Sequence, residues 1–350
     1  MKEIKIIQYS SFYHDKLYAY IEKNYLNRPK QYIDYCLNNL TDNIQGALLC
    51  LDEKDEIVGC QLCFPTKALI KGEEQYIAWG HDLRIDEDYR GDAGMMLMLE
   101  VSQLPVFGMG LSDINKKIQK VLGSTFFDNI IIYGRLNRFF IRSAFQGIVR
   151  KRNSLTHFYT PDKIQTRGQS FSKVNDAASL KIPNGGYWWG KRVDIDFIRD
   201  YDYLSKRFFN NFNKYYFYRL SVQEEYDSCY FVIRPIVYKK IVALSIVDFR
   251  YDLNKPDQFS LITEAVNRIA KINKIGMVFY ISNINHKKTL IKFSRFSILS
   301  FFPLLMKRNP DIDYIACPFF HLSKSATSVA TQADADGDFL CESPVYVTGR

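Results

Sequence analysis

The feature that most constrains this chain is the run WGHDLRIDEDYRGDAGMMLMLE at residues 79–100, where a strand pattern, a glycine turn and a helix pattern follow without a break. The strand pattern extends back to residue 74, and Pro105 ends the helix. The first N–H groups of a helix have no acceptor inside it, so a phosphate fits there without a cationic side chain. Glycine lets the chain approach that phosphate closely. The segment therefore predicts an anion site with a turn and a helix start formed by Arg90, Gly91, Asp92, Ala93, Gly94 and Met95.

Length and composition predict a soluble globular protein. A chain of 350 residues, 47% hydrophobic and 15% aromatic, is long enough for about two domains. No window reaches the roughly 18 to 20 apolar residues of a membrane span, and residues 1–16 lack the apolar core of a signal peptide. We therefore expect a cytoplasmic protein without a membrane span. Seven scattered cysteines indicate reduced thiols, and the close pair Cys60 and Cys63 fits buried strand positions better than a metal site.

The formal net charge of +9 raises the question of a nucleic-acid partner. The densest basic run, RKRN at 150–153, is short, and the other Lys and Arg residues are mixed with acids. No RNA- or DNA-binding module is recognised, so we interpret the excess charge as solvated surface plus some affinity for an anionic small molecule such as a phosphate-bearing cofactor. The acidic run DADGD at 334–338 lacks the glycine and glutamate of a calcium loop, which predicts a polar turn or an acidic pocket rim and no metal.

The chain reads as two α/β halves. In the first, strands are expected at 4–9, 74–85, 106–112 and 129–136, a hairpin at 46–64, and helices at 15–40, 93–104 and 113–123. Residues 149–186 read as a connecting segment with at most one or two edge strands. The second half begins at residue 187, with helices at 196–212 and 259–273, strands at 230–237, 240–250, 276–282 and 313–320, and a polar loop at 323–338. The similar element order suggests a repeat of fold without identity of sequence.

At the Arg-Gly turn the sequence resembles the GNAT superfamily of acyl-CoA-dependent N-acyltransferases. That family carries Arg/Gln-x-x-Gly-x-Gly/Ala after its fourth strand, where main-chain amides hold the coenzyme A pyrophosphate, and DLRIDEDYRGDAGMML at 82–97 looks like this motif. INKKIQKVLGS at 114–124 resembles the helix before the family's Leu-Gly-Phe, so the likeness covers residues 46–135. Ala93 and Met95 replace the motif's glycine and Gly/Ala, unless the loop is one residue shorter and Gly94 takes the last place.

The resemblance implies further contacts and a catalytic strand. Leu83 and Ile85 would bind the pantetheine arm through their backbone, and Ser112 stands where the family often has an asparagine on that arm. A general base is expected on the fourth strand, where His81 and Asp82 lie. Adjacent strand residues face opposite ways, so only one of them can enter the cleft unless a bulge intervenes. The family's general-acid tyrosine would fall on Gln119, which cannot protonate a thiolate, and Ser124 replaces the phenylalanine.

The whole chain resembles two-domain GNAT proteins of bacterial surface-polysaccharide pathways. This implies an acyl-CoA-binding domain at 1–148, a connecting segment at 149–186, and at 187–350 a second GNAT-like domain that shapes the acceptor pocket. The sequence YDLNKPDQF at 251–259 has no Arg-Gly turn, so a second coenzyme site is not expected. The expected activity is N-acetyl transfer from acetyl-CoA, or another acyl-CoA, to a small amine such as an amino sugar. Two other functions stay open as alternatives, namely an inactive GNAT-like scaffold and an aminoacyl-tRNA-dependent transferase. A homodimer is also left open.

Overall fold

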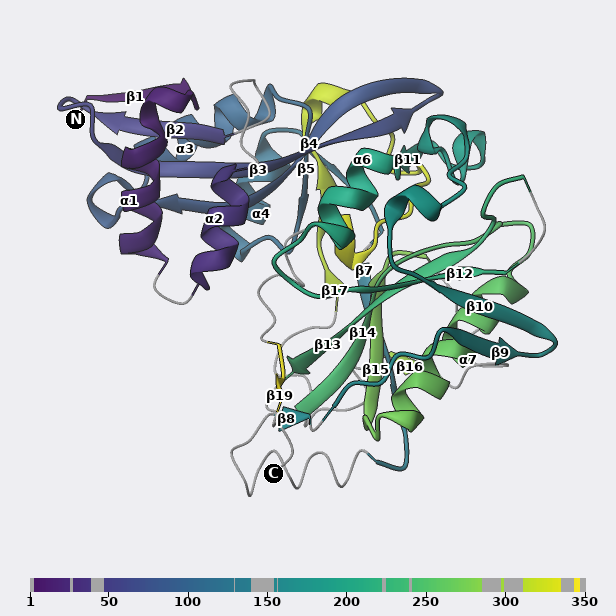
Figure 1. Ribbon diagram of the computed structural model, residues 1–350. Coiled ribbons are helices and arrows are strands. Elements are labelled where there is room, and N and C mark those ends of the chain that lie inside the picture. The colour runs from purple at the N-terminus through teal and green to yellow at the C-terminus, as the bar shows by residue number, and fades with distance from the viewer. Residues whose placement is uncertain are drawn as a thin grey trace. The chain divides into compact units, whose positions relative to one another are not determined.

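The computed structural model describes residues 3–25, 28–38, 47–128, 130–139, 154–155, 157–221, 225–238, 241–284, 297–298, 311–334 and 343–346. The chain forms two compact units (Figure 1). Unit 1 contains residues 1–129 and 312–327, and unit 2 contains residues 130–311 and 328–350. The units are therefore interleaved in sequence, which differs from the consecutive boundaries expected at 148 and 187.

Unit 1 is built on one mixed sheet. In spatial order its strands are β1 (Ile4–Gln8), β2 (Ala47–Asp52), β3 (Ile57–Ile70), β4 (Glu73–Ile85), β5 (Val106–Met109), β18 (Tyr314–Ala316) and β6 (Thr125–Phe126). All neighbours are antiparallel except β4 and β5, which are parallel. The helices are α1 (His14–Asn24), α2 (Lys30–Asn38), α3 (Asp92–Ser102) and α4 (Asp113–Val121). Figure 1 shows α1 and α2 across one face of this sheet, with α3 and α4 on the other.

The core beneath α3 fixes the position of the Arg-Gly turn. Ala93, Leu97, Met98 and Val101 are the buried apolar residues of α3, and their helical spacing gives it one continuous buried face. This face packs on residues of β2, β3, β4 and β5, and Ile118 and Leu122 from the region of α4 join the same cluster. The predicted strand, turn and helix at 74–104 are confirmed, and the start of α3 is held at the carboxyl end of β4.

Unit 2 is built on a second mixed sheet. Its strands in spatial order are β16 (Ser297–Ile298), β7 (Ile130–Leu136), β15 (Met277–Ser282), β14 (Ile241–Arg250), β13 (Tyr230–Tyr238), β12 (Tyr216–Leu220), β10 (Gln169–Val174) and β9 (Lys163–Thr166), and β17 (Asp311–Ile312) also pairs with β7. Helix α7 (Asp257–Ile272) buries its apolar face in one core cluster. The short α6 (Tyr201–Leu204) and the π-helical turn at Ser205–Phe209 pack in another. Strands β8 (Ser154–Leu155) and β19 (Val345–Tyr346) form a separate pair.

Several sequence expectations are wrong in detail. The helix expected at 15–40 is divided into α1 and α2, with Pro29 just before α2, because proline disfavours helix in the residue before it. The strand expected at 313–320 joins the sheet of unit 1, and the strand expected at 129–136 joins that of unit 2. The segment expected to connect two domains supplies β9 and β10, and β10 pairs on both sides. The helix expected at 196–212 begins as β11 (Ile195–Phe197), and β12 was not foreseen.

The described cysteines fit the prediction of reduced, structural thiols. Cys36, Cys50, Cys60, Cys63, Cys229 and Cys317 are all free and buried. Burial raises the pKa of the thiols of both Cys60 and Cys63 to about 12. Cys341 and the basic run at 150–153 lie outside the described residues. Among the helices that the structure describes, none has the length and apolar content needed to cross a bilayer.

Candidate active site

A cleft opens in unit 1 where β4 and β5 diverge. The two strands pair only through Ala78–Gly80 and Val106–Gly108, and β4 then continues to Ile85 without β5, paired only with β3 on its other edge. The opening holds a cavity of about 290 Å³. It is lined by residues of β4, β5, α3, α4 and β18 and of the segments that follow β5 and β18, and these residues include His81, Asp82, Leu83, Met98, Ser112, Asn115, Gln119 and Cys317. A cavity formed by diverging parallel strands exposes backbone at its walls, which suits an extended polar ligand.

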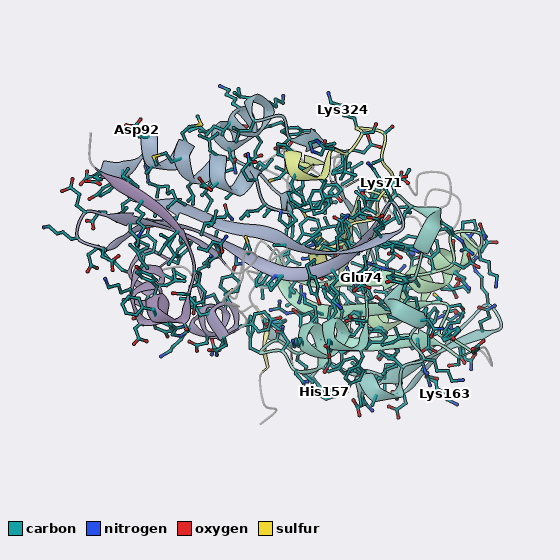
Figure 2. All side chains as sticks on the ribbon, turned by 90° about the horizontal axis from the view of Figure 1, so that it is seen from above. Lys71, Glu74, Asp92, His157, Lys163 and Lys324 are labelled. Atoms are coloured by element: carbon teal, nitrogen blue, oxygen red, sulfur yellow. The ribbon has the colours of Figure 1, made fainter. Side chains whose placement is uncertain are left out.

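The start of α3 carries a set of unpaired backbone donors. Gly91 is the N-cap residue with φ of 100°, a conformation that disfavours any side chain. Within the described part of the chain, the N–H groups of Gly91, Asp92, Ala93 and Gly94 donate to no protein acceptor. A Cβ atom added at Gly91 or Gly94 would have no heavy atom within 4 Å, so the space beside the turn is open. Asp92, labelled in Figure 2, is exposed at this helix start.

Only some of the backbone N–H groups in the predicted anion site are free of a protein acceptor within the described chain. The N–H of Arg90 donates to the carbonyl of Glu87 at 3.3 Å, and that of Met95 donates to the carbonyl of Gly91 at 2.9 Å. Neither amide is available to a ligand, so the available donors run from Gly91 to Gly94. The Arg90 guanidinium pairs with Glu87 at 3.3 Å and is 60% exposed. Four successive unpaired amides at a helix N-terminus are the donor set that phosphate sites commonly use.

A β-bulge brings His81 and Asp82 to the same side of β4. Strand β3 pairs Cys60 with Arg84 but Leu62 with His81, so Gln61 alone faces Asp82 and Leu83. Asp82 has φ of 49°, a left-handed conformation that few residues other than glycine adopt. The side chain of Gln61 braces the bulge by donating to the carbonyl of His81 at 2.7 Å. The bulge resolves the alternative left open by the sequence, because both side chains now meet and both residues line the cavity.

Tyr32 and Arg28 complete a buried network around this pair. Tyr32 Oη lies 3.1 Å from His81 Nδ1 and donates to Asp82 Oδ2 at 2.6 Å. His81 Nδ1 lies 3.2 Å from Asp82 Oδ2, and Arg28 Nη2 donates to Asp82 Oδ1 at 2.6 Å. Tyr25 donates to the carbonyl of Asp82 at 2.7 Å. The sequence analysis missed Tyr25 and Arg28, which lie between α1 and α2, and Tyr32 in α2, since a tyrosine at helical spacing predicts only a core position.

The network keeps the Asp82 carboxylate ionised. Burial alone would raise its pKa, but hydrogen bonds and charge from His81, Tyr32 and Arg28 outweigh burial and lower it below the ordinary value. A general base at this position would need a raised pKa, so direct base catalysis by Asp82 is disfavoured. Its geometry suits orientation of His81 instead, in the manner of an acid that holds an imidazole in one tautomer.

His81 has one ring nitrogen engaged and the other without a hydrogen-bond partner among the described residues. Its ring stacks on Phe64, with centroids 3.9 Å apart and planes at 12°. When Nδ1–H donates to Asp82, Nε2 carries the lone pair. Nε2 is buried and has no hydrogen-bond partner among the described residues. An oriented imidazole with an unpaired nitrogen in a residue that lines a cavity is suited to general-base catalysis.

Of the residues predicted to contact the pantetheine arm, some line the cavity and one packs in the core beside it. Leu83 lines the cavity, whereas Ile85 packs in the core under α3 and its carbonyl lies 3.4 Å from Arg90 Nε. Ser112 lies beyond the end of β5 and caps α4, where its Oγ accepts from the amide of Asn115 at 3.2 Å. Asn115, which the sequence analysis did not single out, lines the cavity with a buried Oδ1 that has no partner among the described residues.

Two other residues that line the cavity, Gln119 and Cys317, are poorly suited to a direct role in catalysis. Gln119 is buried and accepts a hydrogen bond from Ser124 Oγ, so it serves as a structural and polar lining group. Burial raises the pKa of the Cys317 thiol to about 12, which keeps it protonated near neutral pH. A neutral thiol is a poor nucleophile, and an acyl-cysteine intermediate at this position is therefore disfavoured. Within the described residues no cluster of three or more His, Cys, Asp or Glu could hold a metal.

Unit 2 repeats the parallel strand pair but fills its opening. β14 and β15 pair only through Ala243–Ile246 and Met277–Tyr280. Beyond this point Ser282 pairs with Thr331, and Gln332 accepts a hydrogen bond from Ser245 at 2.5 Å. The segment at 328–334, expected to be part of a polar loop, is thus largely buried. Its Asp334 is buried and pairs with Arg199, so the expected polar turn or acidic pocket rim is wrong for this residue, and residues 335–338 lie outside the described part.

Comparisons with solved structures identify the fold. A GCN5-related N-acetyltransferase from Anabaena variabilis ATCC 29413 superposes with a TM-score of 0.57 at 12% identity, covering 89% of this chain and 72% of that one. A probable N-acyltransferase from Enterococcus faecalis V583 gives 0.57 at 11% identity, with the same coverages. N-myristoyltransferase of Saccharomyces cerevisiae with bound myristoyl-CoA gives 0.53 at 9% identity, covering 90% of this chain and 82% of that one. No protein-family model and no curated protein matches the sequence.

The chain therefore has the GNAT fold, and the similarity extends over most of its length. The expected α/β architecture with two mixed sheets flanked by helices is confirmed. At identities near 10% the similarity establishes architecture, and function must be argued from the site.

Proposed function

We propose that this protein is an acyl-CoA-dependent N-acyltransferase whose unit 1 binds the coenzyme. The observation that carries the proposal is the set of available amides at Gly91–Gly94, beside open space at the start of α3. A diphosphate placed there receives several N–H donors and the positive end of the helix dipole. The cavity is lined further along the same helix by Met98 and Val101, which gives the pantetheine arm a route toward the diverging strands.

The proposed chemistry assigns His81 as the general base. Its Nε2 removes a proton from the acceptor ammonium, and the neutral amine then attacks the thioester carbonyl. Asp82 and Tyr32 act as positioning residues, because they fix the ring through Nδ1. As the tetrahedral intermediate collapses, the C–S bond breaks and the thiolate leaves with the amide product formed. Gln119 cannot supply a proton to that thiolate, so this proton comes from the acceptor or solvent.

The acyl group proposed is acetyl. The end of the cavity where β4 and β5 still pair is lined by Phe107, Ile315 and Cys317, whose side chains are buried. A Cβ at Gly108 would lie 3.2 Å from Ile315, which indicates close packing at this end. Close packing leaves little space at this end, which suits a short acyl chain better than a long one. The acceptor proposed is a small amine, and an amino sugar of a bacterial surface-polysaccharide precursor follows from the whole-chain resemblance alone.

A matched pair of glycine variants tests coenzyme binding. Gly91 and Gly72 both lie in unit 1 with φ of 100° and 90°, and an added Cβ meets no atom within 4 Å at either position. Leucine therefore introduces similar backbone strain at both sites, but only Gly91→Leu obstructs the proposed phosphate site. Acetyl-CoA at millimolar concentration should raise the melting temperature of wild type and Gly72→Leu and should fail to do so for Gly91→Leu. Equal stabilisation of both variants would refute the assignment.

A second experiment separates an enzyme from a coenzyme-binding scaffold. Release of free thiol from acetyl-CoA is measured with a panel of amines that includes amino sugars and their nucleotide derivatives. His81→Gln should lower kcat about 10²- to 10⁴-fold while acetyl-CoA still stabilises the protein. Coenzyme binding by wild type without turnover of any amine would favour the scaffold alternative.

A further inference from the structure

Unit 2 contains a second cavity, of about 420 Å³, that shares no lining residue with the cleft of unit 1. Its walls come from three separate segments, at residues 183–192, at 225–228 before β13, and at Asp252 after β14. Tyr187, Trp188, Trp189 and Tyr226 supply its aromatic surface. A cavity of this size with aromatic walls and a few polar groups has the typical make-up of a small-ligand site.

Buried hydrogen bonds hold this cavity in shape without a ligand. Asp196 Oδ2 accepts from the amides of Trp189 and Gly190, both at 2.8 Å. The indole N–H of Trp189 donates to the carbonyl of Tyr251 at 2.8 Å, and the Arg250 guanidinium lies 4.3 Å from the Trp189 ring centroid. Asp227 accepts from the amide of Lys181 at 2.7 Å. Because these hydrogen bonds already fix the supporting segments, binding would require little reorganisation of the walls.

The charged groups at the cavity indicate the kind of ligand. Among the described side chains, Glu225, Asp227 and Asp252 line it together with one cation, Arg192, although the chain as a whole has a net charge of +9. Arg192 pairs with Asp252, and Arg219 pairs with Asp227 at 3.2 Å, which leaves Glu225 exposed at the rim without a cationic partner among the described residues. Ser228 Oγ is buried and has no hydrogen-bond partner in the same part of the chain.

Carboxylates beside aromatic faces favour an organic cation, because the ring face attracts the positive charge and the carboxylate accepts its N–H groups. We propose that this cavity is a binding site for a small organic ammonium ion, with the ammonium at Glu225 and Asp252 and the carbon skeleton against Trp188 and Tyr226. The site is independent of the proposed acyl transfer, since it uses residues of unit 2 only. Aliphatic amines and amino sugars share this chemistry, and the experiment distinguishes them.

Tryptophan fluorescence reads this site directly. The chain has three tryptophans, of which Trp188 and Trp189 line the cavity and Trp79 lies buried in unit 1. In a Trp79→Phe background every indole therefore reports on the cavity. Putrescine and D-glucosamine are titrated at constant ionic strength and compared with D-glucose and N-acetyl-D-glucosamine, which lack the ammonium. We expect a saturable change with one or both amines and none with the two neutral sugars.

Charge-neutral variants test the carboxylates. Glu225→Gln and Asp252→Asn should each weaken amine binding at least tenfold, whereas Asp202→Asn, an exposed acid of α6 with the same change in charge, should leave binding unchanged. Absence of a saturable amine response, an equal response to D-glucose, or unaltered affinity in both acid variants would overturn the proposal. If a variant loses its folded circular-dichroism signal, the comparison of D-glucosamine with N-acetyl-D-glucosamine on the Trp79→Phe protein decides alone. Loss of acetyl-CoA binding would leave this site unaffected.

Discussion

Replacing Asp92 with asparagine should weaken the fold slightly and strengthen coenzyme binding. Asp92 is the first residue of α3, and its exposed carboxylate lies in the turn where the proposed diphosphate binds. In the free protein this carboxylate interacts favourably with the helix dipole, which contributes about 0.3–1 kcal/mol. In the complex the same negative charge repels the diphosphate. A single substitution therefore changes stability and affinity in opposite directions, which a purely structural role of the turn would not produce.

The size of the binding effect follows from Coulomb's law. Two unit charges about 6 Å apart in water interact with about 0.7 kcal/mol, and a diphosphate with two charges doubles this to about 1.4 kcal/mol. That value corresponds to roughly tenfold tighter binding of coenzyme A to Asp92→Asn at low ionic strength. At physiological salt the screening length of about 8 Å reduces the effect to roughly threefold, and at 1 M salt it should vanish.

Glu100 provides the matched control. It is exposed near the other end of α3, about 12 Å along the helix axis from Asp92, and Glu100→Gln makes the same change in net charge. Isothermal titration with coenzyme A should give a lower Kd for Asp92→Asn and an unchanged Kd for Glu100→Gln at physiological salt. Thermal unfolding of the free proteins should show a lower Tm for Asp92→Asn only. Equal changes in Kd for both variants would show that bulk charge, and not the start of α3, governs binding.

Three further outcomes are expected. Folding lowers the pKa of Asp82, so its carboxylate stabilises the fold fully above the unfolded-state pKa of about 3.9 and loses this contribution as pH falls through the folded-state pKa. At pH 7 the Asp82→Asn variant should therefore have a free energy of unfolding about 1–3 kcal/mol below that of wild type. This difference should shrink on acidification. Asp248→Asn removes the carboxylate shared by Arg199 and Arg250 and should cost about 3–5 kcal/mol by chemical denaturation, with Asp202→Asn as the surface control. The six described cysteines are buried, so a thiol reagent at pH 7.5 should label them only after unfolding.

The sequence predicted the elements whose information is local. The alternation at 74–85, the glycine at 91 and the apolar spacing of α3 each act within a few residues, and the structure follows them. The same holds for the hairpin of β2 and β3, whose charged turn separates two apolar runs. The availability of amides at the start of α3 is also a local property, because it follows from helix geometry alone.

Features that depend on distant partners could not be predicted in the same way. A short apolar strand such as β18 or β7 carries no mark of the sheet it will join, so the interleaving of the two units was missed. The burial of the segment at 328–334 depends on two partners far away in sequence, because Asp334 pairs with Arg199 and Thr331 donates to Asp248. Tyr32 likewise gains its site role only because the bulge at Asp82 turns a carboxylate toward α2.

The contrast between the two sheets explains why the coenzyme proposal concerns unit 1 alone. At the start of α7, the amides of Gln258 and Phe259 donate to the carbonyls of Lys255 and Pro256, so that helix start offers fewer unpaired donors than α3. The opening between β14 and β15 is closed by the segment at 328–334, where Thr331 donates to Asp248 at 2.7 Å.

Buried ion pairs hold this segment of unit 2 in place. Arg199 pairs with both Asp248 and Asp334, and Arg250 pairs with Asp248. Withdrawing the segment would leave Arg199 without one of its buried carboxylates, and breaking a buried pair of this kind costs about 3–5 kcal/mol. A coenzyme entering unit 2 would have to offset that cost with few available amides to bind its diphosphate. Unit 1 carries no such obstacle, since its cavity is already open and the amides at the start of α3 are already unpaired.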